Sequence, residues 1–513
     1  MKLATLIQDC ALRHPDREVM VCGDRRLSFG LLNTNANRLA DAYVARGMKK
    51  GDRIAMFLPN SAELIEAMCG VAKSGGIIVP IAVRLAAAEV AHILGDCSPW
   101  AVCYTPAQRD IVHSAIKQLE NPLLVVFDGE AGEDEITFDQ LMSEGRDIPP
   151  PPLSADEDNL MLGYTSGTTG RPKGALATNT ALVLTGGFMN LAEWELTPKD
   201  RILATTPMAH RTGLGRVANA VCCGCTVVIM DKFDAVAAVD LIEKEKITVI
   251  GLVPTIARML IPEIEKRPKA LRSVRLMVAT GEAFPVPVKK RLAAVVPNIG
   301  LYTFFAQTEA GFITGLRPHE QASHPESCGR AVPAVEVRIV DKDFNDVATD
   351  VVGEIICRCG PPGMMSMPEY WNNPAATQAA IHHGWLRTGD LGRMDADGYI
   401  YFVDRAKDMI VSGGLNIYSR EVEDALEAHP AVNEAAVIPI PDEEFGESVF
   451  AYVTLYEGKD VKEQDLINHC RSLIASYKKP KFVRKIDTLP RNSTGKVVKM
   501  ALRESALAET NGN

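Results

Sequence analysis

The sequence lacks a long hydrophobic run, a zinc-like cysteine spacing and an excess of positive charge. Its most apolar region, residues 75–94, is interrupted by Pro80, Arg84 and Glu89, which excludes a membrane-spanning helix. The 12 cysteines are scattered without a four-ligand zinc pattern, so we expect reduced, mostly buried thiols. The formal net charge of -10 argues against nucleic acid or an anionic membrane as the main partner.

The ends of the chain carry no targeting signal that we recognise. The apolar stretch at the N-terminus is too short for a signal peptide and is soon ended by Asp9. The final residues, 509–513, match no peroxisomal or lipidation signal. These absences predict a soluble, cytoplasmic protein without a membrane span.

The length and the alternation of elements predict a multidomain α/β protein. A chain of 513 residues exceeds one hydrophobic core, because cores stop growing at about 250–300 residues. Short β-like runs alternate with amphipathic helices, which indicates parallel sheets covered by helices on both faces. The predicted strands are 53–58, 77–81, 227–230, 249–252 and 276–279, and the predicted helices are 62–73 and 86–94. Prolines at 149–152 predict a stiff, exposed connector.

The pattern changes after residue 353 to short strands with Gly and Asp turns. From residue 421 onward, a helix (421–429), two strands (435–440 and 449–455) and a second helix (463–474) predict a small α+β domain. The predicted fold class is therefore α/β: a large N-terminal domain of layered α/β sheets with a small β-barrel-like part, and a small, mobile α+β C-terminal domain.

Residues 164–174 (YTSGTTGRPKG) form a loop suited to phosphate. Three glycines let backbone N–H groups turn inward, and hydroxyl side chains add donors. Lys173 would supply a mobile positive charge to a polyphosphate. The loop follows an apolar strand at 160–162, which favours a phosphate site over an ordinary exposed turn. It is not a Walker A loop, because Gly174 rather than Ser or Thr follows the lysine.

This loop resembles the signature of the adenylate-forming superfamily, which includes acyl-CoA synthetases, aryl-CoA ligases, non-ribosomal peptide adenylation domains and firefly luciferase. Acyl-CoA synthetases are the nearest match by motif. Several motifs in family order are more specific than any single one. They are 281–284 (GEAF), 305–309 (FAQTE), 386–392 (LRTGDLG), 404–410 (DRAKDMI) and 492–496 (NSTGK). The resemblance implies ATP, Mg²⁺ and coenzyme A as cofactors and a carboxylic acid as the small-molecule substrate.

The resemblance also implies a set of nucleotide-binding residues. Phe305 is expected to stack on adenine, Thr308 to contact the α-phosphate, and Glu309 to hold Mg²⁺. Asp390 can accept hydrogen bonds from both ribose hydroxyls. The full implied set for ATP and AMP is Thr165, Ser166, Gly167, Thr168, Thr169, Gly170, Lys173, Gly281, Glu282, Ala283, Phe304, Phe305, Ala306, Gln307, Thr308, Asp390, Arg405 and Lys496. The sequence departs from the family at Phe305-Ala306, where Tyr-Gly is usual, and at Phe284, where proline is usual.

The resemblance implies roles for two lysines in a two-step reaction, in which the acid is first joined to AMP and then transferred to coenzyme A. Lys407 matches the hinge position, which divides the chain into an N-terminal domain (1–406) and a C-terminal lid domain (407–513). Lys496 matches the lysine that enters the active site during adenylation, where it would stabilise developing negative charge. The implied catalytic residues are Lys496, His210, Thr308 and Glu309.

Coenzyme A is the implied acceptor. Gly413 and Gly414 would allow the close backbone approach of a pantetheine arm. The implied CoA-binding residues are Ser412, Gly413, Gly414, Phe445, Tyr477, Lys479 and Lys481, although an ordinary solvated basic patch would also account for the lysines. No carrier domain follows Lys496, which favours a free acceptor. A stand-alone enzyme that loads an acyl-carrier protein, or a non-catalytic nucleotide sensor, are the alternatives.

The segment 207–213 (PMAHRTG) resembles the family motif that precedes the acyl pocket. His210 matches the gating residue. Arg211 has two interpretations: a surface cation, or a cation that meets a second anionic group on the substrate. The implied acyl-pocket residues are His210, Arg211, Val217, Val221 and Phe304. We expect a fatty or small organic acid as substrate, and the sequence leaves a homodimer open.

Overall fold

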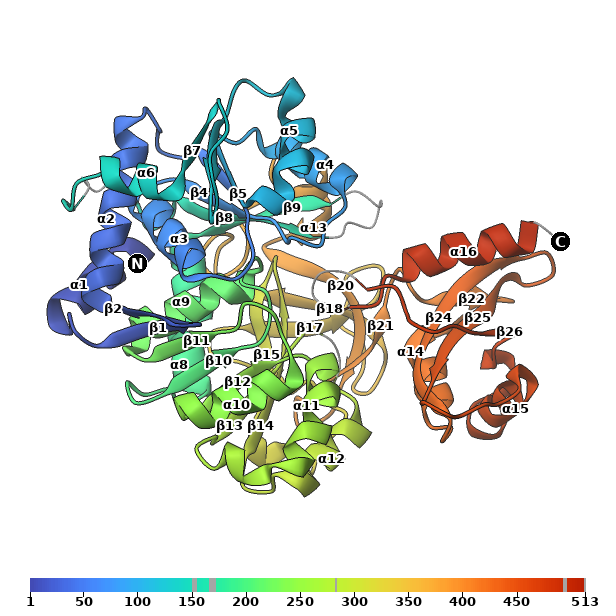
Figure 1. Cartoon of the computed structure of the whole chain (residues 1–513). Coiled ribbons are helices and arrows are strands. Elements are labelled where there is room, and N and C mark those ends of the chain that lie inside the picture. The colour runs from blue at the N-terminus through green and yellow to red at the C-terminus, as the bar shows by residue number, and fades with distance from the viewer. Residues whose placement is uncertain (150–154, 166–171, 282–283, 492–495, 512–513) are drawn as a thin grey trace. The chain divides into compact units, whose positions relative to one another are not determined.

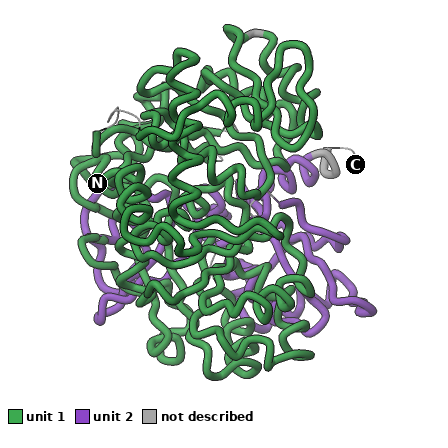
Figure 2. The backbone as a smooth tube through the Cα atoms, turned by 60° about the vertical axis from the view of Figure 1, so that its left-hand side comes forward, with its two compact units in different colours: residues 1–337, 357–386 green, residues 338–356, 387–513 purple. Residues whose placement is uncertain are grey.

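The structure, a computed structural model, describes residues 1–149, 155–165, 172–281, 284–491 and 496–511 (Figure 1). The chain divides into two compact units, coloured separately in Figure 2. The first unit comprises Met1–Val337 and Cys357–Leu386, and the second comprises Arg338–Ile356 and Arg387–Asn513. The boundary predicted at Lys407 stays a prediction.

The first unit holds a seven-stranded sheet that ends in the predicted phosphate loop. Its strand order is β7-β6-β5-β3-β4-β8-β9. The strands are β3 (Arg53–Phe57), β4 (Ile77–Pro80), β5 (Ala101–Tyr104), β6 (Leu123–Val126), β7 (Glu135–Thr137), β8 (Asn159–Thr165) and β9 (Lys173–Thr178). All neighbours are parallel except β8 and β9, which pair antiparallel. The phosphate loop therefore leaves the carboxyl end of β8, the edge at which ligands bind in sheets of this type.

A nine-stranded sheet forms the rest of the first unit, in the order β16-β15-β14-β13-β12-β10-β11-β1-β2. Its strands are β1 (Glu18–Cys22), β2 (Arg25–Ser28), β10 (Arg201–Ala204), β11 (Thr226–Ile229), β12 (Val249–Leu252), β13 (Leu276–Ala279), β14 (Gly300–Gln307), β15 (Gly311–Leu316) and β16 (Arg330–Ala331). Neighbouring strands pair in parallel from β1 through β11, β10, β12 and β13 to β14, whereas the pairs β1–β2, β14–β15 and β15–β16 are antiparallel. The turn between these last two strands carries Thr308 and Glu309.

Helices pack on both sheets of the first unit (Figure 1). They are α1 (Leu3–Arg13), α2 (Phe29–Ala45), α3 (Ala62–Ser74), α4 (Ala87–Cys97), α5 (Arg109–Ala115), α6 (Phe138–Glu144), α7 (Asn179–Val183), α8 (Met189–Glu193), α9 (Arg211–Cys223), α10 (Ala235–Glu245), α11 (Pro254–Lys266), α12 (Val286–Val295) and α13 (Pro374–Ala380). A π-helical turn, Leu184–Phe188, joins α7 to α8.

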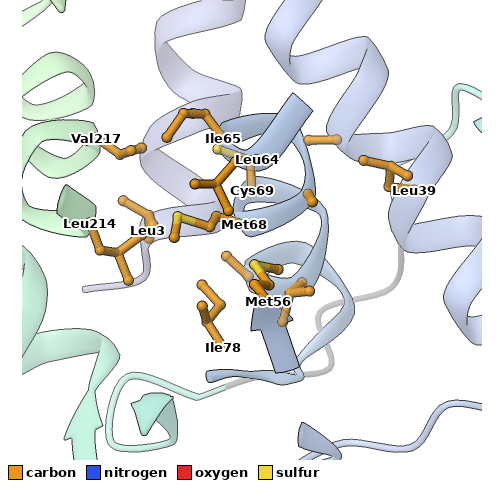
Figure 3. Packing of buried hydrophobic residues seen from close by; sticks show 14 of the residues in the cluster. Leu3, Leu39, Met56, Leu64, Ile65, Met68, Cys69, Ile78, Leu214 and Val217 are labelled. Atoms are coloured by element: carbon orange, nitrogen blue, oxygen red, sulfur yellow. The ribbon is translucent and has the colours of Figure 1, made fainter. Parts of the chain in front are cut away.

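The largest core cluster unites helices that are far apart in the sequence. Met68 of α3 packs with Leu3 of α1 and Leu214 of α9, and Val217 of α9 lies near Ile65 (Figure 3). Every residue of α3 is buried except Glu63. Apolar burial of this extent is the main stabilising contribution to the unit, at about 25 cal/mol per Å² removed from water.

Two smaller sheets and three helices follow along the chain. The first sheet contains β17 (Glu336–Val340), β18 (Gly353–Arg358), β19 (Ile381–His382), β20 (Trp385–Met394) and β21 (Ile400–Arg405). The second contains β22 (Ile410–Ser412), β23 (Leu415–Ile417), β24 (Val432–Asp442), β25 (Gly446–Leu455) and β26 (Phe482–Lys485). The helices are α14 (Ser419–Glu427), α15 (Glu463–Leu473) and α16 (Lys499–Asn511). The predicted α/β fold class and the predicted α+β C-terminal part are confirmed.

The predicted strands and helices agree with the structure to within a few residues. The strands at 249–252 and 276–279 match β12 and β13. The predicted helix at 421–429 begins earlier, at Ser419, because Asp404 of β21 accepts a hydrogen bond from the Ser419 backbone N–H. Most of the proline connector at 149–152 lies outside the described residues. No helix within the described part of the chain is long and apolar enough to cross a membrane.

Gly329 tests the packing at the C-terminal end of β15, beside β16. At Gly329 φ is +94°, and an added Cβ would lie 2.0 Å from the carbonyl carbon of Gly315 in β15. Gly329→Ala should lower the thermal unfolding midpoint strongly, because both backbone strain and a clash with backbone oppose it. Gly51→Ala is the matched control, since Gly51 has φ +84° but no atom within 4 Å of its added Cβ. Its cost should be limited to strain of about 1–2 kcal/mol. Equal midpoints for the two variants would contradict this packing.

Candidate active site

The turn between β14 and β15 brings Glu309 to the start of the predicted phosphate loop. The Glu309 Oε1 atom accepts hydrogen bonds from the Thr165 hydroxyl at 2.9 Å and from the Tyr370 hydroxyl at 3.0 Å. The Glu309 carbonyl accepts from the Met367 N–H at 2.6 Å. Burial and the Glu309 carboxylate raise the pKa of Tyr370, so this phenol stays protonated and donates. One carboxylate therefore joins β8, the turn and the 367–370 segment.

Thr308 reaches the same place because β8 carries a glycine there. An added Cβ at Gly163 would lie 3.2 Å from the Thr308 Cγ2 atom, which is closer than normal packing allows. A larger residue at position 163 would push the turn away from the end of β8. Residues from two separate motifs, Thr165 in one and Thr308 with Glu309 in the other, therefore lie close together at the end of β8.

The ends of the phosphate loop are fixed as neighbouring strands. Thr165 pairs with Lys173 in the register of β8 and β9. The Lys173 Nζ atom lies 5.6 Å from the centre of the Tyr370 ring, a cation–π contact. Ser166, Gly167, Thr168, Thr169 and Gly170 lie outside the described residues, so their predicted phosphate contacts stay predictions. One described end of the loop contacts Glu309 through Thr165, and the other contacts Tyr370 through Lys173.

Arg211 holds the turn from the other side. Its guanidinium donates to the Thr308 carbonyl, to the Thr185 hydroxyl at 3.1 Å and to the Met365 carbonyl at 3.4 Å. Burial lowers the pKa of Arg211 to about 10, while the Glu309 carboxylate acts in the opposite direction. These contacts argue against the surface-cation interpretation of Arg211. They make it a residue that positions the Thr308–Glu309 turn.

His210 lies just before α9 as its N-cap residue. Burial lowers the pKa of His210 to about 4, so the imidazole is neutral at pH 7. A neutral ring can shape a carboxylate's path or exchange a hydrogen bond, but it cannot attract the acid by charge.

The adenine-side residues lie along β13 and β14. Gly281 has φ +101°, a left-handed conformation that a side chain would strain. Thr280 donates its hydroxyl hydrogen to the Phe304 carbonyl at 3.1 Å, which ties the two strands together. A register shift falls between Phe305 and Ala306, at the motif that departs from the family. Glu282 and Ala283 lie outside the described residues, and the assigned contacts of Gln307 with ATP stay predictions.

The two predicted acyl-pocket valines on α9 occupy the hydrophobic core. Val217 is 5% exposed and Val221 is 3% exposed, and both belong to the cluster around α1 and α3 (Figure 3). Their assignment as pocket walls stays a prediction. Phe304 packs elsewhere, against Trp194 at 5.8 Å and Phe312 at 4.8 Å between ring centres.

Asp390 and Arg405, for which the sequence predicts contacts with ribose, form one pair in the second unit. Asp390 and Arg405 are register partners on β20 and β21, and Arg405 Nε lies 3.4 Å from Asp390 Oδ1. The Asp390 N–H donates to the Thr388 hydroxyl at 3.1 Å, and Thr388 donates to the Ile355 carbonyl. The Asp390 backbone is thus held by its own motif, and its carboxylate lies beside Arg405. Such an arrangement suits a carboxylate that accepts two hydroxyl hydrogen bonds.

A charged cluster flanks Lys407 on both sides in the sequence. Asp404 accepts from the Ser419 hydroxyl at 3.0 Å, and Lys499 donates to the same hydroxyl at 2.6 Å and to Glu423 at 2.6 Å. Burial raises the pKa of Asp404. Asp404 precedes the predicted hinge, whereas Ser419 follows it, so this contact links the two sides. The role of Lys407 stays a prediction, as does that of Lys496, whose motif partners 492–495 lie outside the described residues.

The structure brings part of the predicted CoA set together. The Gly413 N–H donates to the Phe445 carbonyl at 2.8 Å, and an added Cβ at Gly413 would lie 3.2 Å from the Phe445 ring. Lys481 pairs with Asp442 at 2.7 Å, and Asp442 also accepts from the Phe445 N–H. Phe445 and Tyr477 expose about half of their surface. Lys479 donates to the Ser476 carbonyl, and Ser412 is half-buried beside the glycines.

The comparisons with known proteins agree with this geometry. Residues 7–371 match the AMP-binding enzyme family, and residues 421–496 match the AMP-binding enzyme C-terminal domain. The chain therefore belongs to the AMP-binding enzyme family, and the resemblance stated from its motifs is confirmed.

Relatives within this family act on different acids. The chain is 36% identical to the long-chain-fatty-acid–CoA ligase FadD13 of Mycobacterium tuberculosis, over 94% of this chain and 93% of that protein. It is 35% identical to the indoleacetate–CoA ligase of Aromatoleum aromaticum, over 99% of both. It is 32% identical to the fatty acid–[acyl-carrier-protein] ligase ScoC of Streptomyces coeruleorubidus, over 98% and 96%. The solved structure of ATP-bound MatB from Rhodopseudomonas palustris matches with a TM-score of 0.88 and 26% identity, over 98% of this chain and 99% of that one.

Sequence reasoning missed Tyr370 and misjudged Arg211. Tyr370 precedes Trp371 and Asn372 in a stretch without chemical motif residues, so no spacing pointed to it. Arg211 follows the gating histidine, and only its contacts with the Thr308 and Met365 carbonyls reveal what it does.

Replacing Arg211 tests its positioning role. Arg211→Lys keeps the charge but replaces the two separated nitrogens of the guanidinium, which reach different acceptors, with a single nitrogen. We expect kcat to fall by about 10–100-fold for every acid tested, because the Thr308–Glu309 turn loses its support. The KM for the acid should change little. An exposed ion pair, Arg291 with Glu265, offers Arg291→Lys as a control without effect.

The alternative for Arg211 gives a different kinetic pattern. If Arg211 instead binds a second anionic group of the substrate, the variant will raise KM for dicarboxylic acids alone. That selective rise would contradict the positioning role.

Proposed function

We propose that the chain is an ATP-dependent acid–CoA ligase that forms an acyl-adenylate and then an acyl-CoA thioester, releasing AMP and pyrophosphate. The observation that carries the proposal is the convergence of Thr165, Thr308 and Glu309 at the end of β8, in a chain of the AMP-binding enzyme family. Its named CoA-ligase relatives, aligned over nearly the whole chain, support coenzyme A as acceptor.

In the first half-reaction, a carboxylate oxygen of the acid attacks the α-phosphorus of ATP. The new P–O bond forms as the bond to pyrophosphate breaks, and the electron pair leaves with pyrophosphate. The phosphate loop between Thr165 and Lys173 would bind the leaving phosphates through backbone N–H groups and the lysine charge. Thr308 would donate to the α-phosphate, and Lys496 would offset negative charge that develops as two anions meet.

The described residues fit a Mg²⁺ ion bound mainly by substrate. Mg²⁺ is commonly held by one or two carboxylates, substrate phosphates and water. Glu309 offers such a carboxylate, fixed by Thr165 and Tyr370. When bound there, the ion would neutralise charge on the pyrophosphate.

In the second half-reaction, the thiolate of coenzyme A attacks the acyl carbonyl. The C–S bond forms, the C–O bond to the phosphate breaks, and AMP leaves. Rotation about Lys407 would withdraw Lys496 and present the Gly413–Phe445 turn, where the pantetheine arm meets backbone rather than side chain. Asp390 with Arg405 would keep the AMP ribose in place through both steps.

A carrier protein is the second candidate acceptor. One relative, ScoC, is named as a fatty acid–[acyl-carrier-protein] ligase and aligns with 98% of this chain. Both acceptors present a phosphopantetheine thiol, so the same turn at Gly413 would serve either. A cytoplasmic location, where ATP and coenzyme A are available, and a homodimer stay predictions.

A panel assay separates these functions. AMP release should require ATP, Mg²⁺ and one acid among fatty, aromatic and dicarboxylic acids, and coenzyme A should raise the turnover. The physical reason is that the acyl-adenylate stays bound until a thiol removes it. Adenylation that coenzyme A does not stimulate, but an acyl-carrier protein does, would favour the second candidate. AMP release from no acid would contradict the ligase.

A further inference from the structure

Arg216 is a buried cation that the mechanism above does not use. It lies in the second turn of α9 and is only 7% exposed. Within the described part of the chain, its guanidinium makes one hydrogen bond, from Nη1 to Asn219 Oδ1 at 3.2 Å, and it has no carboxylate within ion-pair distance. Burial lowers the pKa of Arg216 to about 10, so it keeps its charge at neutral pH. A buried charge without an anionic partner is costly, and proteins rarely retain one without a use.

The surroundings of Arg216 are built around its guanidinium. The Cζ atom lies 5.1 Å from the centre of the Trp194 ring, a cation–π contact. An added Cβ at Gly251 of β12 would lie 2.6 Å from the Nη2 atom, so a side chain there would displace the guanidinium from its present position. The Trp194 Nε1 donor is also buried and makes no hydrogen bond with the described residues. Arg216 thus has one amide acceptor but no carboxylate, and Trp194 Nε1, on the ring that it contacts, has no acceptor among the described residues.

Arg216 lies on the side of α9 that faces Trp194, close to a residue predicted to line the acyl pocket. On α9, Arg216 and Val221 are separated by about 140° around the helix axis, so Arg216 does not face the core that buries Val217 and Val221. Its contact Trp194 packs against Phe304, which the family resemblance assigns to the acyl pocket. His210, at the beginning of α9, is six residues away, which is about 9 Å along the helix. Arg216 therefore follows His210 on α9, and its guanidinium contacts Trp194, which packs against Phe304.

We propose that Arg216 binds a second carboxylate at the far end of the acid, so that the preferred substrate is a dicarboxylic acid of medium length activated at one end. This inference rests on the proposed ligase function and names its substrate class. A carboxylate would neutralise the guanidinium and accept hydrogen bonds in the bidentate geometry that arginine favours. It could also accept from Trp194 Nε1. The chain between the two carboxylates would span from His210 to Arg216.

The experiment compares acids of equal length that carry one or two carboxylates. The pairs are butyric with succinic acid, hexanoic with adipic acid, and decanoic with sebacic acid. For the wild-type enzyme, kcat/KM for AMP release should be higher with the dicarboxylic member of at least one pair. Arg216→Met should reduce kcat/KM for that diacid by at least about 30-fold and leave the monoacid nearly unchanged.

Two further variants guard against a trivial loss of folding. Gly251→Ala keeps the charge but displaces the guanidinium, so it should reduce the same diacid preference. Arg109→Met is the matched control, because Arg109 is paired with the buried carboxylate of Glu135 at 2.8 Å. It should lower the thermal unfolding midpoint without changing the acid preference. Arg216→Met should not lower that midpoint, since it removes an unpaired buried charge.

The outcomes distinguish the inference from the function on which it rests. AMP release with monoacids, combined with an acid preference that Arg216→Met does not change, would overturn the diacid assignment and leave the ligase intact. If Arg216→Met lowers the unfolding midpoint and leaves the acid preference unchanged, Arg216 stabilises the fold and does not bind substrate. No AMP release from any acid would overturn both.

Discussion

The carboxylate of Glu309 is the interaction on which the candidate site depends. The carboxylate accepts hydrogen bonds from Thr165 at the end of β8 and from Tyr370 in the 367–370 segment. Arg211 of α9 donates to the carbonyl of the preceding residue, Thr308. Each partner donates to oxygen, so the turn is held by converging hydrogen bonds rather than by apolar packing. A carboxylate fixed in this manner loses little freedom when it binds a metal–phosphate complex, which is the basis of preorganised catalysis.

Helix α9 connects the reacting groups to the core through different faces. Val217 and Val221 pack into the cluster with α1 and α3, which anchors the helix. Arg211 reaches back to the β14–β15 turn, and Arg216 points to Trp194 on the side of Phe304. A single helix thereby sets the position of the phosphate-side turn and of the acid's far end. Arg211 therefore supports the phosphate-side turn, whereas Arg216 is the residue that we propose for the far carboxylate of the acid.

The sequence predicted the fold class and the family well, because the first depends on local patterns and the second on the order of short motifs. The strands at 249–252 and 276–279 follow from apolar runs, and Thr308, Glu309 and Asp390 follow from motif order. Contacts that join distant segments could not be predicted in this way. Tyr370 reaches Glu309 across 61 positions, and Arg216 differs from a surface arginine only in its burial. The valines of α9 were assigned to the pocket because they follow the gating motif, and only the structure shows that they pack in the cluster with α1 and α3.

The central claim is that the acid's own oxygen attacks the α-phosphorus, and an isotope experiment tests it directly. The active acid, labelled with ¹⁸O in the reacting carboxylate, is converted with ATP, Mg²⁺ and coenzyme A, and the products are examined by mass spectrometry. The account predicts one ¹⁸O atom in AMP and none in pyrophosphate, because the bridging oxygen stays with the α-phosphate when the thioester forms. Formation of ADP with labelled orthophosphate, or unlabelled AMP, would contradict it.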